Sequence, residues 1–444
     1  MNKKIANWGN YPVAVCDEID FSLEEQLLPL IQGSGPAIAR GNGRCYGDAS
    51  LSETTYSTLK YDKVLAFDTQ NGLLTCQAGI TLDQVLEIIV PMGWFLPVTP
   101  GTKFITLGGA VASDVHGKNH HVDGAFSSHI ADIDILVADG RVINCSPEFN
   151  IDLFEATCGG MGLTGLILRV SFRLKKIETA YIRQKQVKAA NLEEIISLFE
   201  QYRHYTYSVA WIDCLKKGKD FGRSILILGE HATVNELSNK RQSTPLLLPD
   251  KKQITFPVNL PSFILNMYTV RAFNFLYYHK NIKREINRVV SYEPFFYPLD
   301  AILHWNKGYG KNGFVQYQFV IPLESRKGLI EILTRISDRG MGSFLAVLKV
   351  FGKQQSMISF PMEGYTLALD FPVRNGLFSF LDELDRIVLN YGGRIYLSKD
   401  ARMNPEIFWN SYGNLDRFME TIRKYNPDYK FRSFLSDRLL LTKN

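Results

Sequence analysis

The stretch PGTKFITLGGAVASDVHGKNHH, residues 100–121, decides how the rest of this 444-residue chain is interpreted. Its central part is built from residues with a very small side chain or none, among them Gly108, Gly109, Ala110, Ala112, Ser113 and Gly117. A backbone with so little bulk can lie flush against a flat ligand that carries phosphate. The polar residues His116, Lys118 and Asn119 can hydrogen-bond the edges of such a ligand. We interpret this stretch as half of a cradle for a flavin dinucleotide.

A second glycine-rich stretch, RGNGRCYGD at residues 40–48, is the candidate for the other half. Its glycines allow successive backbone N–H groups to converge on a pyrophosphate, and Arg40 or Arg44 adds positive charge. A glycine-rich turn between two strands is, by itself, equally typical of an ordinary connection. Two such loops together favour a dinucleotide, because a ligand of that length needs contacts from both.

A third glycine-rich stretch, GMGLTG at residues 160–165, matches the pattern G-x-G-x-x-G. In a nicotinamide-binding fold that pattern follows a strand and opens a helix. Here a helix is predicted before it, near Asp152–Thr157, and the β-rich run Leu166–Phe172 follows it. We therefore reject a Rossmann-type NAD site.

Composition sets wider limits on function. Hydrophobic residues make up 45% and charged residues 21%, values typical of a globular chain of this length with two domains. The net charge of +5 suits an anionic small molecule or membrane surface and is too small to indicate nucleic acid. The N-terminus has no apolar run that would indicate a signal peptide, and six scattered cysteines without a Cys-x-x-Cys pair indicate a reducing compartment. We expect a cytoplasmic protein.

Local patterns predict several elements of the N-terminal part. Ser22-x-x-Glu25 is a candidate capping box for a helix to about Ile31, and Thr81-x-x-Gln84 is another, opening a second helix. Two predicted strands, 133–137 and 141–145, are joined at Asp139-Gly140, a strong hairpin signal.

The pattern changes after about Leu174. Strands near 208–213 and 223–228 alternate with amphipathic helices near 192–202, 325–336 and 378–389. This order predicts an antiparallel sheet with helices on one face, and hence an α+β chain with two domains.

Residues 245–290 differ from their surroundings. The run PLLLP at 245–249 precedes Lys251-Lys252, residues 256–278 are aromatic and apolar, and four basic residues follow. Apolar surface edged by basic residues can lie in a membrane interface. A core helix with a solvated basic end fits the same pattern, and both interpretations stay open.

The histidines near residue 120 do not have the spacing of a metal site. His120 and His121 are adjacent, and no acidic residue or cysteine lies at ligand spacing, so we expect no metal. His116 is better placed to bond a cofactor or substrate. Lys399 follows a β-rich run, and a fixed cation there would stabilise the negative charge of a reduced flavin. The alternative is a surface lysine paired with Asp400.

At this point the motifs resemble those of a known family. The chain is similar to the vanillyl-alcohol-oxidase/p-cresol-methylhydroxylase superfamily of flavoproteins and, within it, to the branch of decaprenylphosphoryl-β-D-ribose 2′-oxidases. The resemblance covers nearly the whole chain. Its motifs are RGNGRCYGD (40–48), GTKFITLGGAVASDVHGKNHH (101–121), GGMGLTG (159–165), AWID (210–213), PLD (298–300), FVQYQFVIP (314–322), LKVFG (348–352), LDFP (369–372) and YLSKDAR (396–402).

The resemblance implies an FAD domain made of residues 1–177 and 394–444, with an antiparallel-sheet substrate domain, 178–393, inserted between them. Related proteins with covalent flavin carry a histidine or cysteine where this chain has Arg44 and, approximately, Thr102. We therefore expect non-covalent FAD.

The resemblance also implies roles for individual residues. The residues expected to hold FAD are Arg40, Gly41, Asn42, Gly43, Arg44, Cys45, Thr102, Thr106, Gly108, Gly109, Ser113, His116, Gly117, Asn119, Ile167 and Tyr396. The residues expected to bind substrate are Trp211, Gln316, Gln318, Lys349 and Lys399. The catalytic candidates are Lys399, to stabilise the reduced flavin, and Tyr46, His116 or Asp370 as the base.

The implied reaction is oxidation of the 2-hydroxyl of a polyprenylphosphoryl-β-D-ribose to the 2-keto sugar, half of an epimerisation towards an arabinose donor. An NAD(P)H-dependent keto-reductase partner, a peripheral membrane surface and no nucleic acid are expected. Thr366-Leu367-Ala368 departs from the Asn-x-Cys of the related oxidases, which alters the pocket wall. The alternatives are an alditol or aldonolactone oxidase acting on a soluble sugar, and a flavin-binding scaffold without turnover.

Overall fold

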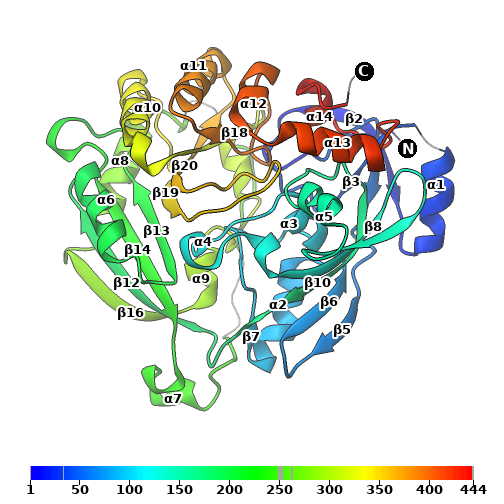
Figure 1. Ribbon diagram of the computed structural model, residues 1–444. Coiled ribbons are helices and arrows are strands. Elements are labelled where there is room, and N and C mark those ends of the chain that lie inside the picture. Colours follow the sequence, from blue (N-terminus) through cyan, green and yellow to red (C-terminus); the bar gives the residue numbers. More distant parts are fainter. Residues whose placement is uncertain (1, 34, 249–253, 262–263, 443–444) are drawn as a thin grey trace.

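An eight-stranded antiparallel sheet dominates one side of the computed structural model, and two smaller sheets lie on the other (Figure 1). The structure describes residues 2–33, 35–248, 254–261 and 264–442. The predicted mixture of helices with antiparallel sheet is thus confirmed. Within these ranges no helix is long and apolar enough to cross a membrane.

The large sheet contains strands from β12 to β21, and every neighbouring pair in it is antiparallel. Its spatial order is β16 (Glu285–Ser291), β12 (Tyr181–Ala189), β14 (Ser224–His231), β13 (Tyr207–Ile212), β19 (Ala346–Phe351), β20 (Gly364–Pro372), β18 (Phe314–Ile321) and β21 (Arg394–Ile395).

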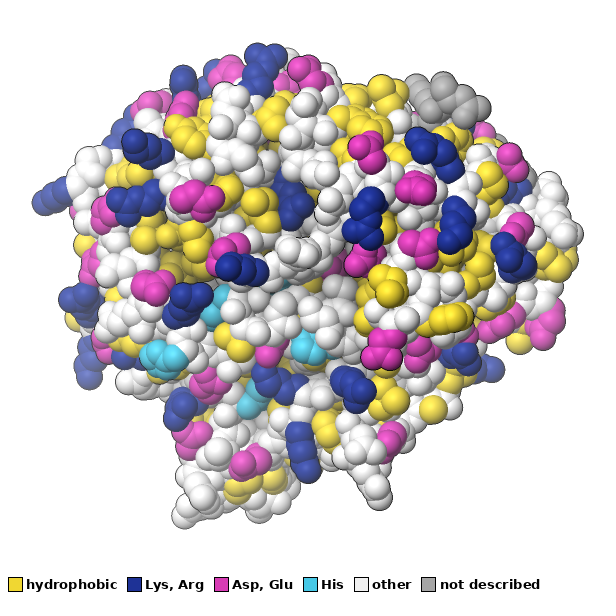
Figure 2. Space-filling model, viewed as in Figure 1, with side chains coloured by type: hydrophobic (Ala, Val, Ile, Leu, Met, Phe, Trp, Pro, Cys, Tyr) yellow, Lys and Arg dark blue, Asp and Glu magenta, His cyan; other side chains and the backbone are white. Residues whose placement is uncertain are grey.

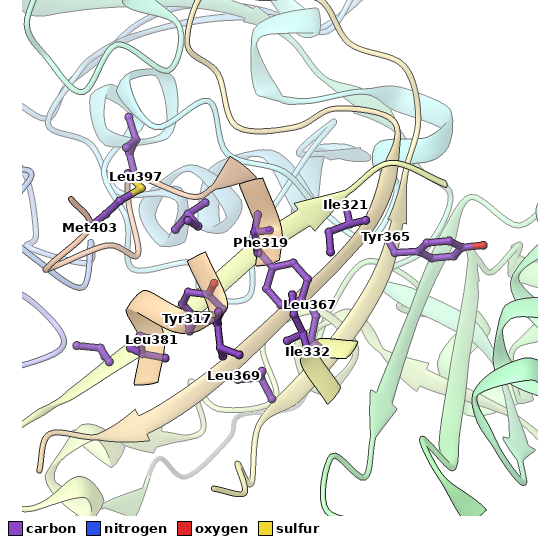
Figure 3. Close-up of a cluster of buried hydrophobic side chains, with 14 of the residues drawn as sticks. Tyr317, Phe319, Ile321, Ile332, Tyr365, Leu367, Leu369, Leu381, Leu397 and Met403 are labelled. Carbon is purple, nitrogen blue, oxygen red and sulfur yellow. The ribbon is translucent and has the colours of Figure 1, made fainter. Parts of the chain in front are cut away.

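Side chains alternate along the central strands because successive residues of a strand point to opposite faces. Tyr317, Phe319 and Ile321 of β18 lie beside Tyr365, Leu367 and Leu369 of β20 and pack with helix residues such as Ile332 and Leu381 (Figure 3). The intervening residues are polar or small: Gln316, Gln318, Thr366, Ala368 and Asp370. One face of the sheet is therefore core, and the other is free to carry chemistry.

Helices cover the core face of the sheet, as predicted (Figure 1). Their apolar residues recur at helical spacing, and α10 ends at Gly340, whose φ of 67° is the left-handed conformation that favours glycine. These helices are α6 (Leu192–Gln201), α10 (Arg326–Arg339) and α11 (Leu377–Asn390). A fourth, α8 (Met267–His279), buries only Val270 and Asn274 and leaves most of its surface exposed.

The smaller sheets come from the N-terminal part of the chain. One has the order β1 (Asn2–Ala6), β2 (Val13–Asp20), β4 (Thr54–Ser57) and β3 (Ala37–Arg40), in which β4 is parallel to both of its neighbours. The other has the order β5 (Val64–Asp68), β6 (Leu73–Gln77), β10 (Leu166–Arg173), β8 (Ile130–Leu136) and β9 (Val142–Cys145). Two short pairs complete the set: β7 (Trp94–Phe95) with β11 (Lys175–Lys176), and β15 (Ile254–Thr255) with β17 (Ile302–Leu303).

The remaining helices are mostly short. Those of the N-terminal part are α1 (Leu27–Gly33), α2 (Leu82–Ile89), α3 (Leu107–Ala112), α4 (His120–Asp123) and α5 (Ile151–Thr157). Later in the chain lie α7 (Asn239–Gln242), α9 (Tyr292–Phe296), α12 (Pro405–Ser411), α13 (Leu415–Tyr425) and α14 (Phe434–Arg438).

Most local predictions are confirmed. The β8–β9 hairpin forms with Gly140 at a φ of 88°, and Thr81 and Gln84 cap α2 reciprocally. The G-x-G-x-x-G stretch lies after helix α5 and before strand β10. The Ser22–Glu25 box is wrong. The side chain of Gln26 instead accepts the N–H groups of Ser22 and Leu23, which turns the chain into a short 3₁₀ segment before α1.

The C-terminal helices return to the N-terminal sheets (Figure 1). Arg438 of α14 forms two hydrogen bonds with the carboxylate of Asp48, each 2.8–3.0 Å, and an ion pair of 2.8 Å with Asp400. Gly47, beside Asp48, packs against the same turn, where an added Cβ would lie 1.9 Å from the carbonyl oxygen of Asp400. The first glycine loop and the turn that carries Lys399 are thus held in contact.

We expect Gly47→Ala to destabilise the protein by at least about 1–3 kcal/mol, because the methyl group forces the loop and the turn apart. Gly413→Ala is the matched control, since nothing lies within 4 Å of its Cβ position. Denaturant unfolding followed by circular dichroism measures both variants. Equal stability of the two would contradict the close contact.

Candidate active site

A cavity of about 670 Å³ opens where the glycine loops, the inner face of the large sheet and the 396–401 turn meet. The predicted site residues that line it are Gly41, Asn42, Gly43, Arg44, Cys45, Tyr46, Thr102, Thr106, Gly108, Gly109, Ser113, His116, Gly117, Ile167, Trp211, Gln316, Gln318, Lys349, Tyr396 and Lys399. Residues from seven separate stretches of the sequence therefore line one cavity.

Three predicted site residues lie outside this lining. The Arg40 guanidinium donates to the carbonyl oxygens of Ala6 and Gly41 and so braces the loop from behind. The Asn119 amide donates to the carbonyl oxygen of Pro97 and to Asp123. Asp370 is buried behind Gln316.

The first loop presents free hydrogen-bond donors. The backbone N–H groups of Asn42, Gly43 and Arg44 have no acceptor in the part of the chain that the structure describes. Gly43 has a φ of 57°, which turns the loop so that successive N–H groups can face one ligand. The Arg44 guanidinium lies 4.1 Å from the ring centroid of Trp8 at the edge of the cavity.

The two loops lie too close for side chains at their glycines. The Asn42 amide donates to the carbonyl oxygen of Phe104 at 2.9 Å, and a Cβ on Gly41 would lie 2.2 Å from Thr106 Oγ1. A Cβ on Gly108 would lie 3.0 Å from the Cβ of Ala78, which is also a tight contact. The unpaired backbone N–H groups of the first loop suit a pyrophosphate, and the small residues of the two loops leave room for a flat ring system.

His116 is buried and lines the cavity beside the large sheet, where it contacts Gln318 of β18. Burial, together with Lys349, His120 and Lys399, holds its pKa well below the ordinary value of 6.5. Its Nε2 lies 3.0 Å from Nε2 of Gln318, which also donates to Thr366 Oγ1. Nδ1 is buried and has no protein partner among the described residues, so it is available to a ligand.

Three half-buried lysines lie on the same side, and each has a depressed pKa. Burial lowers the pKa of Lys118 to about 8. Burial, with Lys118 and Lys399, lowers that of Lys349 to about 7. Burial lowers that of Lys399 to about 8 against the opposing effect of Asp370. None of the three has an ion-pair partner within 4 Å among the described residues, so an anion would relieve their repulsion.

Asp370 anchors a polar network beneath the lysines. Gln316 donates to its carboxylate at 2.6 Å and to Tyr46 OH at 3.3 Å, and Tyr309 donates to it at 3.3 Å. Burial raises the Asp370 pKa to about 7, although these donors and Lys399 oppose the shift. The Lys399 ammonium lies 4.1 Å from the Tyr46 ring centroid, so the network sets where that cation lies.

The other histidines near residue 120 have structural partners. His120 is hydrogen-bonded to the side chain of Gln354. His121 is hydrogen-bonded to the backbone carbonyl oxygen of Tyr205, and His129 is hydrogen-bonded to the backbone carbonyl oxygen of Asp123. In the described ranges no three His, Cys, Asp or Glu side chains gather as metal ligands do.

Sequence reasoning missed part of the cavity wall. Beyond the predicted residues, Gln184, Gln186, Arg288, Asp300 and Trp305 also line it. The alternation in YIRQKQVKA (181–189) was the available signal, because Gln184 and Gln186 share one face of a strand. That alternation does not tell which face of the strand a cavity covers.

Sequence comparison with known proteins places this chain in a family. A model described as an FAD binding domain matches residues 32–146. Decaprenylphosphoryl-beta-D-ribose oxidase of Mycolicibacterium smegmatis is 36% identical over 450 aligned residues, which cover 99% of this chain and 98% of that protein. The chain belongs to the decaprenylphosphoryl-β-D-ribose oxidase family.

Two further proteins are also similar to this oxidase-family chain. An uncharacterized Streptomyces coelicolor protein from the mprA 5′ region is 32% identical over 81% of the chain and 100% of its own length. A putative D-arabinono-1,4-lactone oxidase of Neurospora crassa is 32% identical, but over only 26% of the chain and 20% of that protein. The chain is an FAD-dependent oxidoreductase.

We expect trichloroacetic acid to release all of the flavin into the supernatant. Arg44 and Thr102 cannot form the bond to flavin that His or Cys forms in covalent relatives, and burial raises the pKa of the Cys45 thiol. Absorbance of the supernatant and the pellet measures the partition. Yellow colour retained in the washed pellet would refute non-covalent binding.

Proposed function

We propose that this chain oxidises the 2-hydroxyl of a polyprenylphosphoryl-β-D-ribose to the 2-keto sugar, as the first half of an epimerisation towards an arabinose donor. The near full-length match to the mycobacterial oxidase carries the proposal, because it spans both the flavin loops and the sheet that faces them. An NAD(P)H-dependent keto-reductase then completes the epimerisation, since a 2-keto product must be reduced to give the inverted alcohol.

The proposal includes a division of the chain. Residues 1–177 and 394–444 form the FAD domain, and 178–393 form the substrate domain inserted in it. The contacts of Arg438 with Asp48 and Asp400 support the assignment of residues 394–444 to the same domain as residues 1–177. The pairing of Arg394–Ile395 with β18 keeps the chain in the large sheet for two residues beyond that boundary.

His116 is the base in this proposal. FAD, when bound, supplies the acceptor for the hydride that leaves C2. The hydroxyl proton goes to a protein group, and His116 lines the cavity and is neutral at pH 7 because its pKa is depressed. Burial raises the pKa of Tyr46 well above 10, so its phenol stays protonated, and Asp370 does not line the cavity. His116 Nδ1 accepts the proton when the ring bonds Gln318 through an Nε2–H group, which requires the opposite orientation of the Gln318 amide.

The three cavity lysines have two different roles in this proposal. Lys399 places a cation beside Tyr46 and the flavin side of the cavity, where it stabilises negative charge that develops during hydride transfer. Lys118 and Lys349 supply the charge that holds the substrate phosphate. Trp211, Gln316 and Gln318 form the rest of the wall around the sugar.

The protein acts at a membrane surface, because a polyprenyl tail remains in the bilayer. Exposed apolar side chains of α8 and the loop after it support this: Tyr268, Phe275, Leu276 and Ile282 are 74%, 54%, 67% and 98% exposed. Of the two interpretations of residues 245–290, these exposures favour a surface segment over a core helix. Pro249, Lys251, Lys252 and residues 262–263 of the predicted segment lie outside the described residues.

An anaerobic titration of the yellow protein with polyprenylphosphoryl ribose tests the function. Bleaching of the flavin absorbance is expected, because hydride leaves the substrate and no oxygen is present to reoxidise the protein. Bleaching by free pentitols or aldonolactones alone would favour the soluble-sugar oxidase. Flavin that no alcohol reduces would favour a scaffold without turnover.

Lys399→Ala should lower kcat by about 10²–10³-fold while FAD stays bound, because a charge-stabilising donor is lost. In the unaltered enzyme kcat should fall at a pH above about 8, since the Lys399 cation has a pKa of about 8 in the empty cavity and a bound anion raises that value. Lys399→Arg should remove that alkaline limb, because a guanidinium stays charged. A Lys399→Ala enzyme of normal kcat, or an arginine variant with the same alkaline limb, contradicts this role.

A further inference from the structure

The cavity continues from the catalytic lysines across the width of the large sheet. Gln186 pairs with Ile227, Ile227 pairs with Val209, and the register of β13 with β19 continues this row to Lys349. All four residues line the cavity. Neighbouring strands lie about 4.8 Å apart, so the backbones of Gln186 and Lys349 are separated by about 14 Å.

The middle of this row is apolar. Ile227, Val209 and Val347 line the sheet side, and Phe295 and Phe296 also line the cavity. An isoprenoid chain leaving the catalytic end would meet these side chains first.

The far end of the row becomes polar again. Gln184 and Gln186 are each only 5% exposed. The Gln184 side-chain oxygen accepts a hydrogen bond from Arg288 Nε at 2.7 Å. Because a guanidinium can only donate, this bond fixes the amide orientation, and Gln184 Nε2 is left without an acceptor among the described residues. Gln186 bonds Asn281 through its oxygen at 2.9 Å, and its Nε2 is likewise free there.

Two cations complete this end of the cavity. Lys280 lies with its ammonium 3.5 Å from the ring centroid of Tyr277, and Arg288 pairs across strands with Gln184. Neither cation has an ion-pair partner within 4 Å in the described part of the chain. Asp300 is the one carboxylate in the described lining, and Lys103 and Arg44 place it beside the FAD loops. The far end therefore offers donors and positive charge with no acid to satisfy them.

We propose that Gln184, Gln186, Lys280 and Arg288, the outer anion site, bind the phosphate of a bilayer phospholipid at the cavity mouth. A cluster made only of donors suits an oxyanion. The substrate's own phosphate is bonded to C1 of the sugar and stays near Lys118 and Lys349, about 14 Å away by strand spacing. A second phosphate must therefore fill the outer site, and the exposed apolar residues Phe275, Leu276 and Ile282 on the same segment favour a bilayer as its source.

This inference deepens the proposed function, since it relies on the lipid tail leaving through the mouth. Cosedimentation of the flavin-loaded protein with vesicles made of equal parts of phosphatidylcholine and phosphatidylglycerol tests it. Lys280→Gln with Arg288→Gln should weaken vesicle binding about tenfold or more. Gln184→Leu, which keeps the net charge, should also weaken it severalfold. The control Arg386→Gln with Arg423→Gln removes the same charge from helices α11 and α13 and should bind as the unaltered protein does.

The measurements distinguish specific binding at the outer anion site from general electrostatic attraction to an anionic membrane. Retained flavin absorbance confirms that each variant is folded. Normal binding by Gln184→Leu, or equal loss in the control pair, would overturn the outer anion site. Soluble dihexanoyl phosphatidylglycerol should compete with vesicles while inorganic phosphate should not. Equal competition by inorganic phosphate would replace the lipid with a free-phosphate site.

The same preparation distinguishes the outer site from the oxidase reaction. Flavin that bleaches with the lipid-linked sugar, in a protein whose variants all bind vesicles equally, would overturn the outer site alone. Site-dependent vesicle binding in a protein whose flavin does not bleach would overturn the oxidase proposal alone.

Discussion

The absence of a side chain at Gly47 is the constraint on which the site depends. It lets the first glycine loop lie against the backbone of the 398–401 turn, where Tyr46 N–H donates to the carbonyl oxygen of Ser398 at 2.9 Å. Arg438 fixes the same contact from the C-terminal side by binding Asp48 and Asp400. Segments about 350 residues apart are joined there, so the pyrophosphate loop and the Lys399 cation have one common support.

Electrostatics then give the cavity its character. Six lysine or arginine side chains and the single carboxylate of Asp300 are found in its described lining (Arg44, Lys118, Lys280, Arg288, Lys349, Lys399). The exterior is different, because acidic and basic side chains are interspersed on the face seen in Figure 2 without a large region of one sign. The mild net charge of +5 thus conceals a concentration of positive charge along this one cavity. Charge held inside a cavity selects small anions and does not bind extended polyanions.

Sequence reasoning reached the parts of the site that rest on local chemistry. The glycine loops were predictable because only small residues tolerate such close backbone approach, as at Gly41 and Gly108. Gln316, Gln318 and Lys349 came from the family resemblance, and the strand alternation agrees with it. Asp370 and Arg40 were predicted to face the ligand, but both lie behind the residues that line the cavity. The sequence does not show this, because the orientation of a side chain depends on tertiary packing. Gln184 and Arg288 were missed for the same reason, since pairing of β12 with β16 joins residues more than 100 positions apart.

The depressed pKa values of the cavity lysines link anion binding to proton uptake. Lys349, with a pKa of about 7, and Lys118 and Lys399, with pKa values of about 8, together hold fewer than three protons in the empty cavity near neutral pH. An anion that enters stabilises their charged forms and raises those pKa values. Binding therefore draws protons from solution, and the affinity for an anionic ligand declines as the medium becomes more alkaline. Occupancy of the cavity by an anion therefore depends on the pH of the solution around the protein.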